Sequence, residues 1–260
     1  MTDPAGPVPV VAPETIGEIE PLDLLVVAPH PDDAELGMGG TIAKMIDAGR
    51  RVGILDLTSG EPTPHGDPVR RHAETTAASY ALAGPANELA WRGNAGMPNR
   101  QLQPSLDNRQ RLAGYFRRLR PRMIFAPYWV DAHPDHAAAT ELVEAARFWS
   151  KLTKTDQPGQ LPLAGERFHP PRIFYYFCIH LRIVVEPHWI VDISDVWPRK
   201  RKAIEAYESQ FIDGRDPGPP SMIDGFETTA RYWGQMIARR YGEPFATREP
   251  IGLTTLDAIV

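Results

Sequence analysis

Strand-like and helix-like segments alternate along the first 149 residues of this sequence. Residues 22–28 (LDLLVVA) form an apolar run of the kind that is buried on both faces of a parallel sheet. The predicted strands are 22–28, 52–58, 88–91 and 123–127, and the predicted helices between and after them are 39–48, 68–83, 105–120 and 137–149. This β-α-β-α order predicts a doubly wound, mostly parallel sheet covered by helices on both faces.

The second half of the chain is less regular. We expect a smaller C-terminal extension of strands and helices on the Rossmann-like three-layer α/β sandwich, and its elements are strands at 172–177 and 189–193 and helices at 194–210 and 226–240. Residues 151–171 lack periodicity and contain several prolines, which indicates a surface loop acting as a lid or an interface arm. Residues 1–20 contain no Lys, Arg or aromatic residue and are expected to be a flexible tail, followed by a single domain over 21–260.

Composition excludes several classes of function. The net charge of −5 weighs against a general nucleic-acid binder, because contacts to phosphates need a positive field. The longest clean apolar run, Leu24–Ala28, is far too short to cross a bilayer, and residues 1–20 have no positive charge to begin a secretory signal. The single cysteine, Cys178, cannot form an internal disulfide. We therefore expect a cytoplasmic protein that binds neither nucleic acid nor membrane.

Two clusters of ionisable residues follow predicted strands. His-Pro-Asp-Asp at 30–33 comes directly after the first strand, and His-Pro-Asp-His at 133–136 comes after the fourth. Because the carboxyl ends of parallel strands lie at the same edge of a sheet, we expect the two clusters to meet in space. Either cluster alone would be typical of a turn. Together they place several ionisable groups on one edge, which is unfavourable unless a cation or pairing compensates.

The two clusters contain the ligand set of a catalytic metal site. His30, Asp33 and His136 offer two imidazoles and a carboxylate, as in zinc sites that keep one position open. A metal ion there lowers the pKa of bound water to about 7. The side chains left over are Asp32, Asp135 and His133. A carboxylate among them can accept a proton from water, and a protonated imidazole can stabilise an oxyanion, so the clusters predict metal-assisted hydrolysis of an acyl group.

The strings VVAPHPDDAELGMGGTIAKM and APYWVDAHPDHAAA resemble the LmbE/PIG-L-like family of zinc-dependent N-acetyl-sugar deacetylases. Shorter strings are similar to one branch, the N-acetylglucosaminyl malate deacetylases of bacillithiol biosynthesis: DLTSGEPT, NAGMPNR, VDISDV, EAYESQF and RRYGEPF. The resemblance runs from about residue 22 to 253. It implies a small N-acetyl-sugar substrate, Zn²⁺ (with Fe²⁺ as the alternative metal), and a homo-oligomer.

The resemblance also implies roles for single residues. His30, Asp33 and His136 match the metal ligands, and Asp32 matches the general base. His133 matches the residue that stabilises the oxyanion and protonates the leaving amine. Asp135 is expected to orient His133.

Four further residues are candidates for substrate binding. Arg71 matches an arginine that lines the substrate pocket, although pairing with Glu74 on a helix surface is an equal alternative. Asn99 and Arg100 follow the third strand, and His180 follows the fifth. Arginines near the pocket would suit an acidic aglycone such as malate. The alternatives are a deacetylase of another small glycoside, of mycothiol or antibiotic type, and a non-catalytic sugar-binding protein of Rossmann-like fold.

Overall fold

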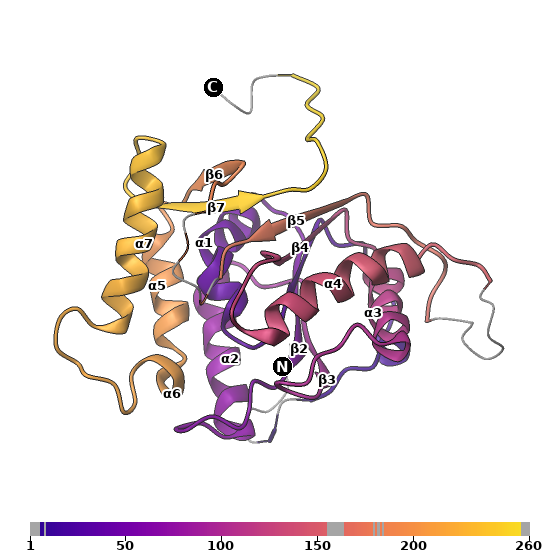
Figure 1. Cartoon of the computed structure of the whole chain (residues 1–260), viewed down its shortest axis with the longest axis horizontal. Coiled ribbons are helices and arrows are strands. Elements are labelled where there is room, and N and C mark those ends of the chain that lie inside the picture. Colours follow the sequence, from indigo (N-terminus) through magenta and orange to yellow (C-terminus); the bar gives the residue numbers. More distant parts are fainter. Residues whose placement is uncertain are drawn as a thin grey trace.

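The computed structural model describes residues 6–7, 9–154, 164–178, 180, 183 and 185–255. Within these residues seven strands form one sheet in the order β3-β2-β1-β4-β5-β7-β6 (Figure 1). The strands are β1 (Leu24–Ala28), β2 (Val52–Thr58), β3 (Trp91–Met97), β4 (Met123–Pro127), β5 (Arg172–Tyr176), β6 (Trp189–Asp192) and β7 (Gly242–Ala246). The helices are α1 (Asp33–Asp47), α2 (Pro68–Ala83), α3 (Leu106–Leu119), α4 (Pro134–Trp149), α5 (Trp197–Glu205), α6 (Glu208–Phe211) and α7 (Met222–Met236).

The sheet is parallel from β3 to β5, and β7 runs antiparallel to both of its neighbours. The chain winds outward from β1 through β2 to β3, then returns to pair β4 with the other side of β1. The carboxyl ends of β1 and β4 therefore flank the topological switch point, where ligands bind in sheets of this kind. The predicted fold class is confirmed.

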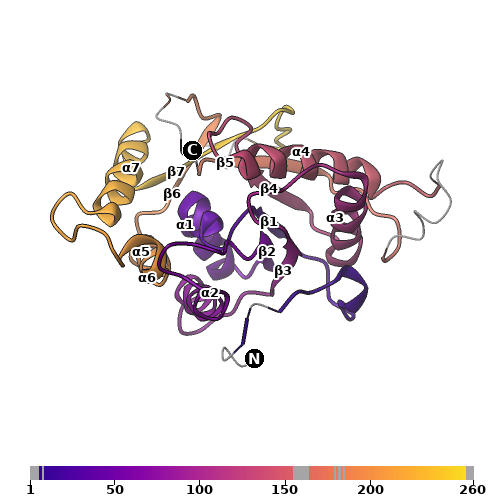
Figure 2. The same cartoon turned by 60° about the horizontal axis from the view of Figure 1, so that its bottom comes forward.

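Helices cover both faces of the sheet because its central strands are apolar on both sides. Leu25 and Val27 of β1 pack into a core with α3 and α4, whereas Leu24 and Val26 pack into a second core with α1, α2 and α5. Figure 2 shows the two sets of helices on opposite sides of the strands. Every residue of β1 is buried, which explains why its sequence is a continuous apolar run instead of an alternating one.

Several boundaries differ from those predicted. Helix α1 begins at Asp33 and α4 at Pro134, so both start inside the ionisable clusters and not after them. Strand β3 covers Trp91–Met97 instead of 88–91, because the two glycines and the asparagine in this segment have low strand propensity. The helix expected over 194–210 is divided into α5 and α6. Strand β7 was not predicted, because Pro244 is a poor strand residue. Pro244 lies in the part of β7 that pairs with β6 but not with β5.

Helix α1 is broken at Met38, whose φ of −150° is not helical. The backbone N–H groups of Gly40 and Thr41, just after the break, both donate to the carboxylate of Glu243 in β7, at 2.8 and 2.7 Å. The ammonium group of Lys200 in α5 lies 2.5 Å from the same carboxylate and donates to the carbonyl of Leu36 at 2.8 Å. This buried pair holds the two parts of α1 in place.

Part of the expected N-terminal tail contacts the domain. Val10 forms a bridge with Asn94, Pro13–Thr15 form a short 3₁₀ helix, and Ile16 is buried in the core beside α3. The boundary between tail and domain at residue 20 stays a prediction. Residues 155–163 of the loop expected over 151–171 lie outside the described residues. None of the described helices is long and apolar enough to span a membrane.

Candidate metal centre

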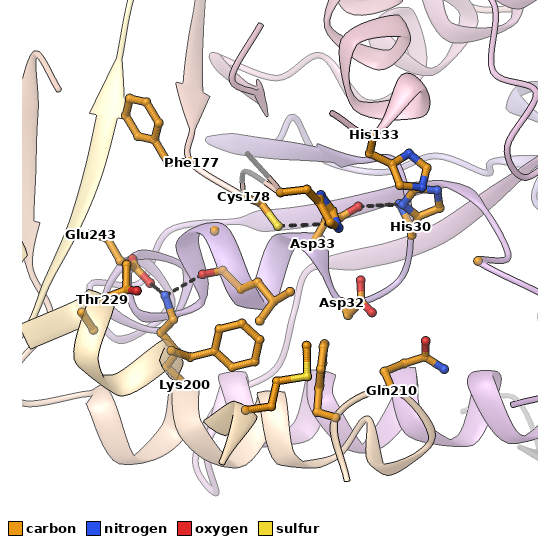
Figure 3. Close-up of a pocket in the computed structure, with 18 of the residues that line it drawn as sticks. His30, Asp32, Asp33, His133, Phe177, Cys178, Lys200, Gln210, Thr229 and Glu243 are labelled. Atoms are coloured by element: carbon orange, nitrogen blue, oxygen red, sulfur yellow. Dashed lines mark hydrogen bonds and ion pairs between the residues drawn. The ribbon is translucent and has the colours of Figure 1, made fainter. Parts of the chain in front are cut away.

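The two ionisable clusters meet at the switch point, as their positions predicted. His30 follows β1, Asp33 is the first residue of α1, and His136 lies in the first turn of α4. One ligand atom from each of the three residues lies within 4.8 Å of the others. The Asp33 carboxylate is central, with Oδ2 3.1 Å from His30 Nδ1 and 3.3 Å from His136 Nε2. His30, Asp33 and His133 are drawn together in Figure 3.

The outer nitrogen of each imidazole faces another carboxylate. His30 Nε2 lies 3.1 Å from Asp135 Oδ2, and His136 Nδ1 lies 2.8 Å from Asp131 Oδ2. Carboxylates placed in this way fix the ring orientation and raise the basicity of histidines that bind metals. His136 Nε2 is buried and makes no well-formed hydrogen bond, and the nearest charged group is Asp33 Oδ2 at 3.3 Å. The donor set and this inward-facing nitrogen both fit a divalent cation.

The electrostatics of the cluster favour positive charge at its centre. Burial lowers the pKa of His30, but the carboxylates of Asp135 and Asp33 outweigh it and raise the pKa to about 9. Burial likewise lowers the pKa of His136, while Asp33 and Asp131 raise it to about 10. Burial raises the pKa of Asp33, yet the two imidazoles hold it well below its ordinary value. The same field that retains protons on the imidazoles attracts a metal ion in their place.

Asp32 lies beside this centre on strained backbone. Its φ of 122° is rare for a residue with a side chain, and such strain persists where the surrounding structure enforces it. Arg71 donates to Asp32 Oδ2, to the carbonyl of Pro31 and to Glu61 Oε1, all at 3.0–3.1 Å. Burial raises the pKa of Asp32 to about 7, against the lowering effect of Arg71. A carboxyl group poised in this range suits acceptance of a proton near neutral pH.

His133 forms the other wall of the centre. Its ring lies against those of His30 and His136, with centroids 4.7 and 5.0 Å apart. Burial and these two neighbouring imidazoles lower the pKa of His133 to about 4. The contacts of Asp135 differ from those expected, since its carboxylate accepts from the backbone of Arg100 and faces His30, and only its backbone N–H donates to His133 Nδ1.

A cleft of about 760 Å³ opens over the centre. All four residues predicted to bind substrate line this cleft, but they differ in exposure and in the partners they already have. Arg71 is 2% exposed and occupied by Asp32 and Glu61, and the alternative partner Glu74 pairs with Arg70 instead. The remaining three are Asn99, whose Oδ1 is buried without a partner, Arg100, and the exposed His180, whose backbone N–H donates to Asp131.

Comparisons with known proteins agree with this site. A family model described as PIG-L: GlcNAc-PI de-N-acetylase matches residues 25–147, a span that contains both ionisable clusters. The crystal structure of the conserved protein TT1542 from Thermus thermophilus is 40% identical, with a TM-score of 0.78, and the match covers 90% of this chain and 97% of that one. The chain belongs to the PIG-L family.

Two other relatives have named activities. A diacetylchitobiose deacetylase of Thermococcus kodakarensis is 29% identical over 237 residues, covering 85% of this chain and 80% of the relative. A 1D-myo-inositol 2-acetamido-2-deoxy-alpha-D-glucopyranoside deacetylase of Tsukamurella paurometabola is 32% identical over 189 residues, covering 58% of this chain and 61% of the relative. The resemblance of the sequence to the PIG-L family is thereby confirmed, whereas the bacillithiol branch stays a prediction.

Sequence reasoning missed two parts of the site in this PIG-L family member. The partnership of Asp131 with His136 was not predicted, although Asp131 stands five residues before His136, a spacing that a strand-to-helix turn can close. The far wall of the cleft comes from α5, α6, α7 and β7, and its lining includes Lys200, Gln210, Thr229 and Glu243 (Figure 3). Gln210 and Glu243 lie in the strings EAYESQF and RRYGEPF, but the sequence did not assign them to the cleft, because their proximity to it depends on how the C-terminal helices pack.

Proposed function

We propose that this protein is a metal-dependent hydrolase that removes the acetyl group from an N-acetylglucosamine conjugate. The observation that supports it is the convergence of His30 Nδ1, Asp33 Oδ2 and the buried His136 Nε2 beside the carboxyl group of Asp32. The named relatives support an N-acetyl amide as the bond that is broken. Their substrates share an acetamido sugar and differ in what is attached to it.

In this proposal His30, Asp33 and His136 hold the metal, with Zn²⁺ first and Fe²⁺ as the alternative. When bound, such an ion supplies Lewis acidity that polarises a carbonyl oxygen and acidifies water. Asp32 accepts a proton from the attacking water, and Arg71 keeps its carboxylate aimed at the cleft. His133 Nδ1 accepts from the Asp135 backbone N–H at the amino end of α4, which leaves its other ring nitrogen to donate to the carbonyl oxygen or to the leaving amine.

The specific substrate implied by the resemblance is N-acetylglucosaminyl malate. Arg100 and Arg215 line the cleft, and among the described residues neither has a carboxylate partner, so both are available to an acidic aglycone. Asn99 Oδ1 and His180 are further polar contacts for the sugar. A cytoplasmic location and a homo-oligomeric state belong to the same proposal and call for fractionation and sizing of the native protein.

Release of free amine from N-acetylglucosamine, its methyl glycoside, diacetylchitobiose and the malate conjugate tests the activity. We expect turnover that a chelator abolishes and added Zn²⁺ or Fe²⁺ restores. His136→Ala is expected to lose bound metal, as measured by elemental analysis, whereas His169→Ala, at a surface histidine away from the cluster, keeps it. Protein that binds these sugars but releases no amine even with Zn²⁺ or Fe²⁺ added would favour a non-catalytic binding protein instead.

A further inference from the structure

The cleft has two unlike sides. One side carries the His/Asp cluster and Asp32, as Figure 3 shows. The opposite side is built by the C-terminal helices and by the ends of β5 and β7. We name it the apolar arm and define it by its lining residues: Phe177, Phe211, Met222, Phe226, Trp233 and Pro244.

The apolar arm is partly open to solvent. Met222 is 41% exposed, and Phe177, Phe226 and Trp233 are only half-buried. Phe226 lies edge-on against Phe211 with ring centroids 5.3 Å apart, which gives the arm a rigid aromatic wall. Aromatic and methionine side chains that line a cleft without being covered by the protein itself are available to cover an apolar ligand.

Charged groups beside the arm are already balanced. The Lys200 ammonium group is taken by Glu243 and by the Leu36 carbonyl, and Lys200 is only 5% exposed. An acidic group beside Glu243 would therefore meet a carboxylate whose positive partner, Lys200, is already engaged. Arg100 and Arg215 also line the cleft, where they donate to the backbone carbonyls of Pro62 and Gln210.

We propose that the apolar arm binds a hydrophobic group carried by the amino-sugar substrate, so that N-acylglucosamine conjugates with an apolar substituent bind more tightly than their methyl or acetyl counterparts. This inference rests on the proposed deacetylation and adds the substrate class to it. The substituent is either an aglycone on the anomeric oxygen or a longer acyl chain on the nitrogen. Both have the same chemistry in the arm, and matched compounds distinguish them.

The experiment compares three compounds with the full-length protein: methyl N-acetylglucosaminide, its hexyl counterpart, and methyl N-hexanoylglucosaminide. Binding is measured by calorimetry and turnover by release of free amine. Burial of a hexyl chain is expected to improve affinity and kcat/KM by at least about 10-fold over the methyl glycoside. A gain confined to the hexyl glycoside assigns the arm to the aglycone, and a gain confined to the hexanoyl compound assigns it to the acyl chain.

Two methionines of α7 provide a matched pair of variants. Met222→Asp places a charge in the arm and is expected to remove most of the preference for the hydrophobic compound. Met236→Ala, at the other end of the same helix, 54% exposed and outside the cleft, is expected to change nothing. Equal affinity for all three compounds would overturn the inference. Absence of amine release with a retained binding preference would instead overturn the deacetylase proposal and leave the arm's assignment supported.

Discussion

Loss of the Glu243 carboxylate is expected to be among the most destabilising single changes in this chain. Glu243 is 1% exposed and its carboxylate accepts from Lys200, from the Gly40 and Thr41 backbones, and from the Thr41 hydroxyl at 2.6 Å. Glu243→Ala leaves a buried ammonium group unpaired, which costs about 3–5 kcal/mol, and removes the cap of the second part of α1. For a domain of this size the melting temperature should fall by roughly 10 °C.

Urea and thermal unfolding measure this loss. Glu243→Gln keeps one of the two acceptor oxygens and the volume of the side chain, so it is expected to lose less than Glu243→Ala, although one of the two backbone N–H groups loses its acceptor. Glu205→Ala is the control, since Glu205 pairs with Arg201 on the surface, where such a pair contributes about 0.3–0.5 kcal/mol. If Glu243→Ala cost no more than this control, the claim that the pair holds the broken helix together would be wrong.

Three further predictions concern the centre and its support. Asp32→Asn should reduce turnover by at least about 100-fold while elemental analysis finds the metal retained, and wild-type turnover would exclude Asp32 as the base. Asp131→Asn should weaken metal binding about 10- to 100-fold, as measured by competition with a chelator, whereas the exposed Asp195→Asn should not; equal affinities would show that the outer carboxylate is dispensable. Gly37→Ala should destabilise the fold by about 1–3 kcal/mol in urea, because the added Cβ would lie 2.2 Å from the buried ring of Tyr176; an unchanged midpoint would mean that the ring can move aside.

The parts of the fold and of the site that depend on local pattern could be predicted from the sequence. The apolar run of β1 on its own indicates a strand buried on both faces, and the parallel order then places the two ionisable clusters at one edge. The convergence of His30, Asp33 and His136 follows from this topology without knowledge of any side-chain conformation.

The features that escaped prediction depend on distant contacts. The break at Met38 is stabilised by Glu243, about two hundred residues away, so the sequence around Met38 does not predict it. Arg71 was predicted to bind substrate, yet its guanidinium group is paired with Glu61, which lies on a loop ten residues earlier in the chain. Strand β7 exists because β5 and β6 flank it, against the preference of Pro244.

The two sides of the cleft come from separate stretches of the polypeptide. The three side chains of the proposed metal site lie between residues 30 and 136, whereas the apolar arm is contributed by residues 177–244. Substitutions in the later stretch can therefore change which attached group is accepted without changing the residues of the metal site. This separation would let the same reaction be used on many conjugates. An experiment that aims at a new specificity should therefore exchange the C-terminal third of the chain.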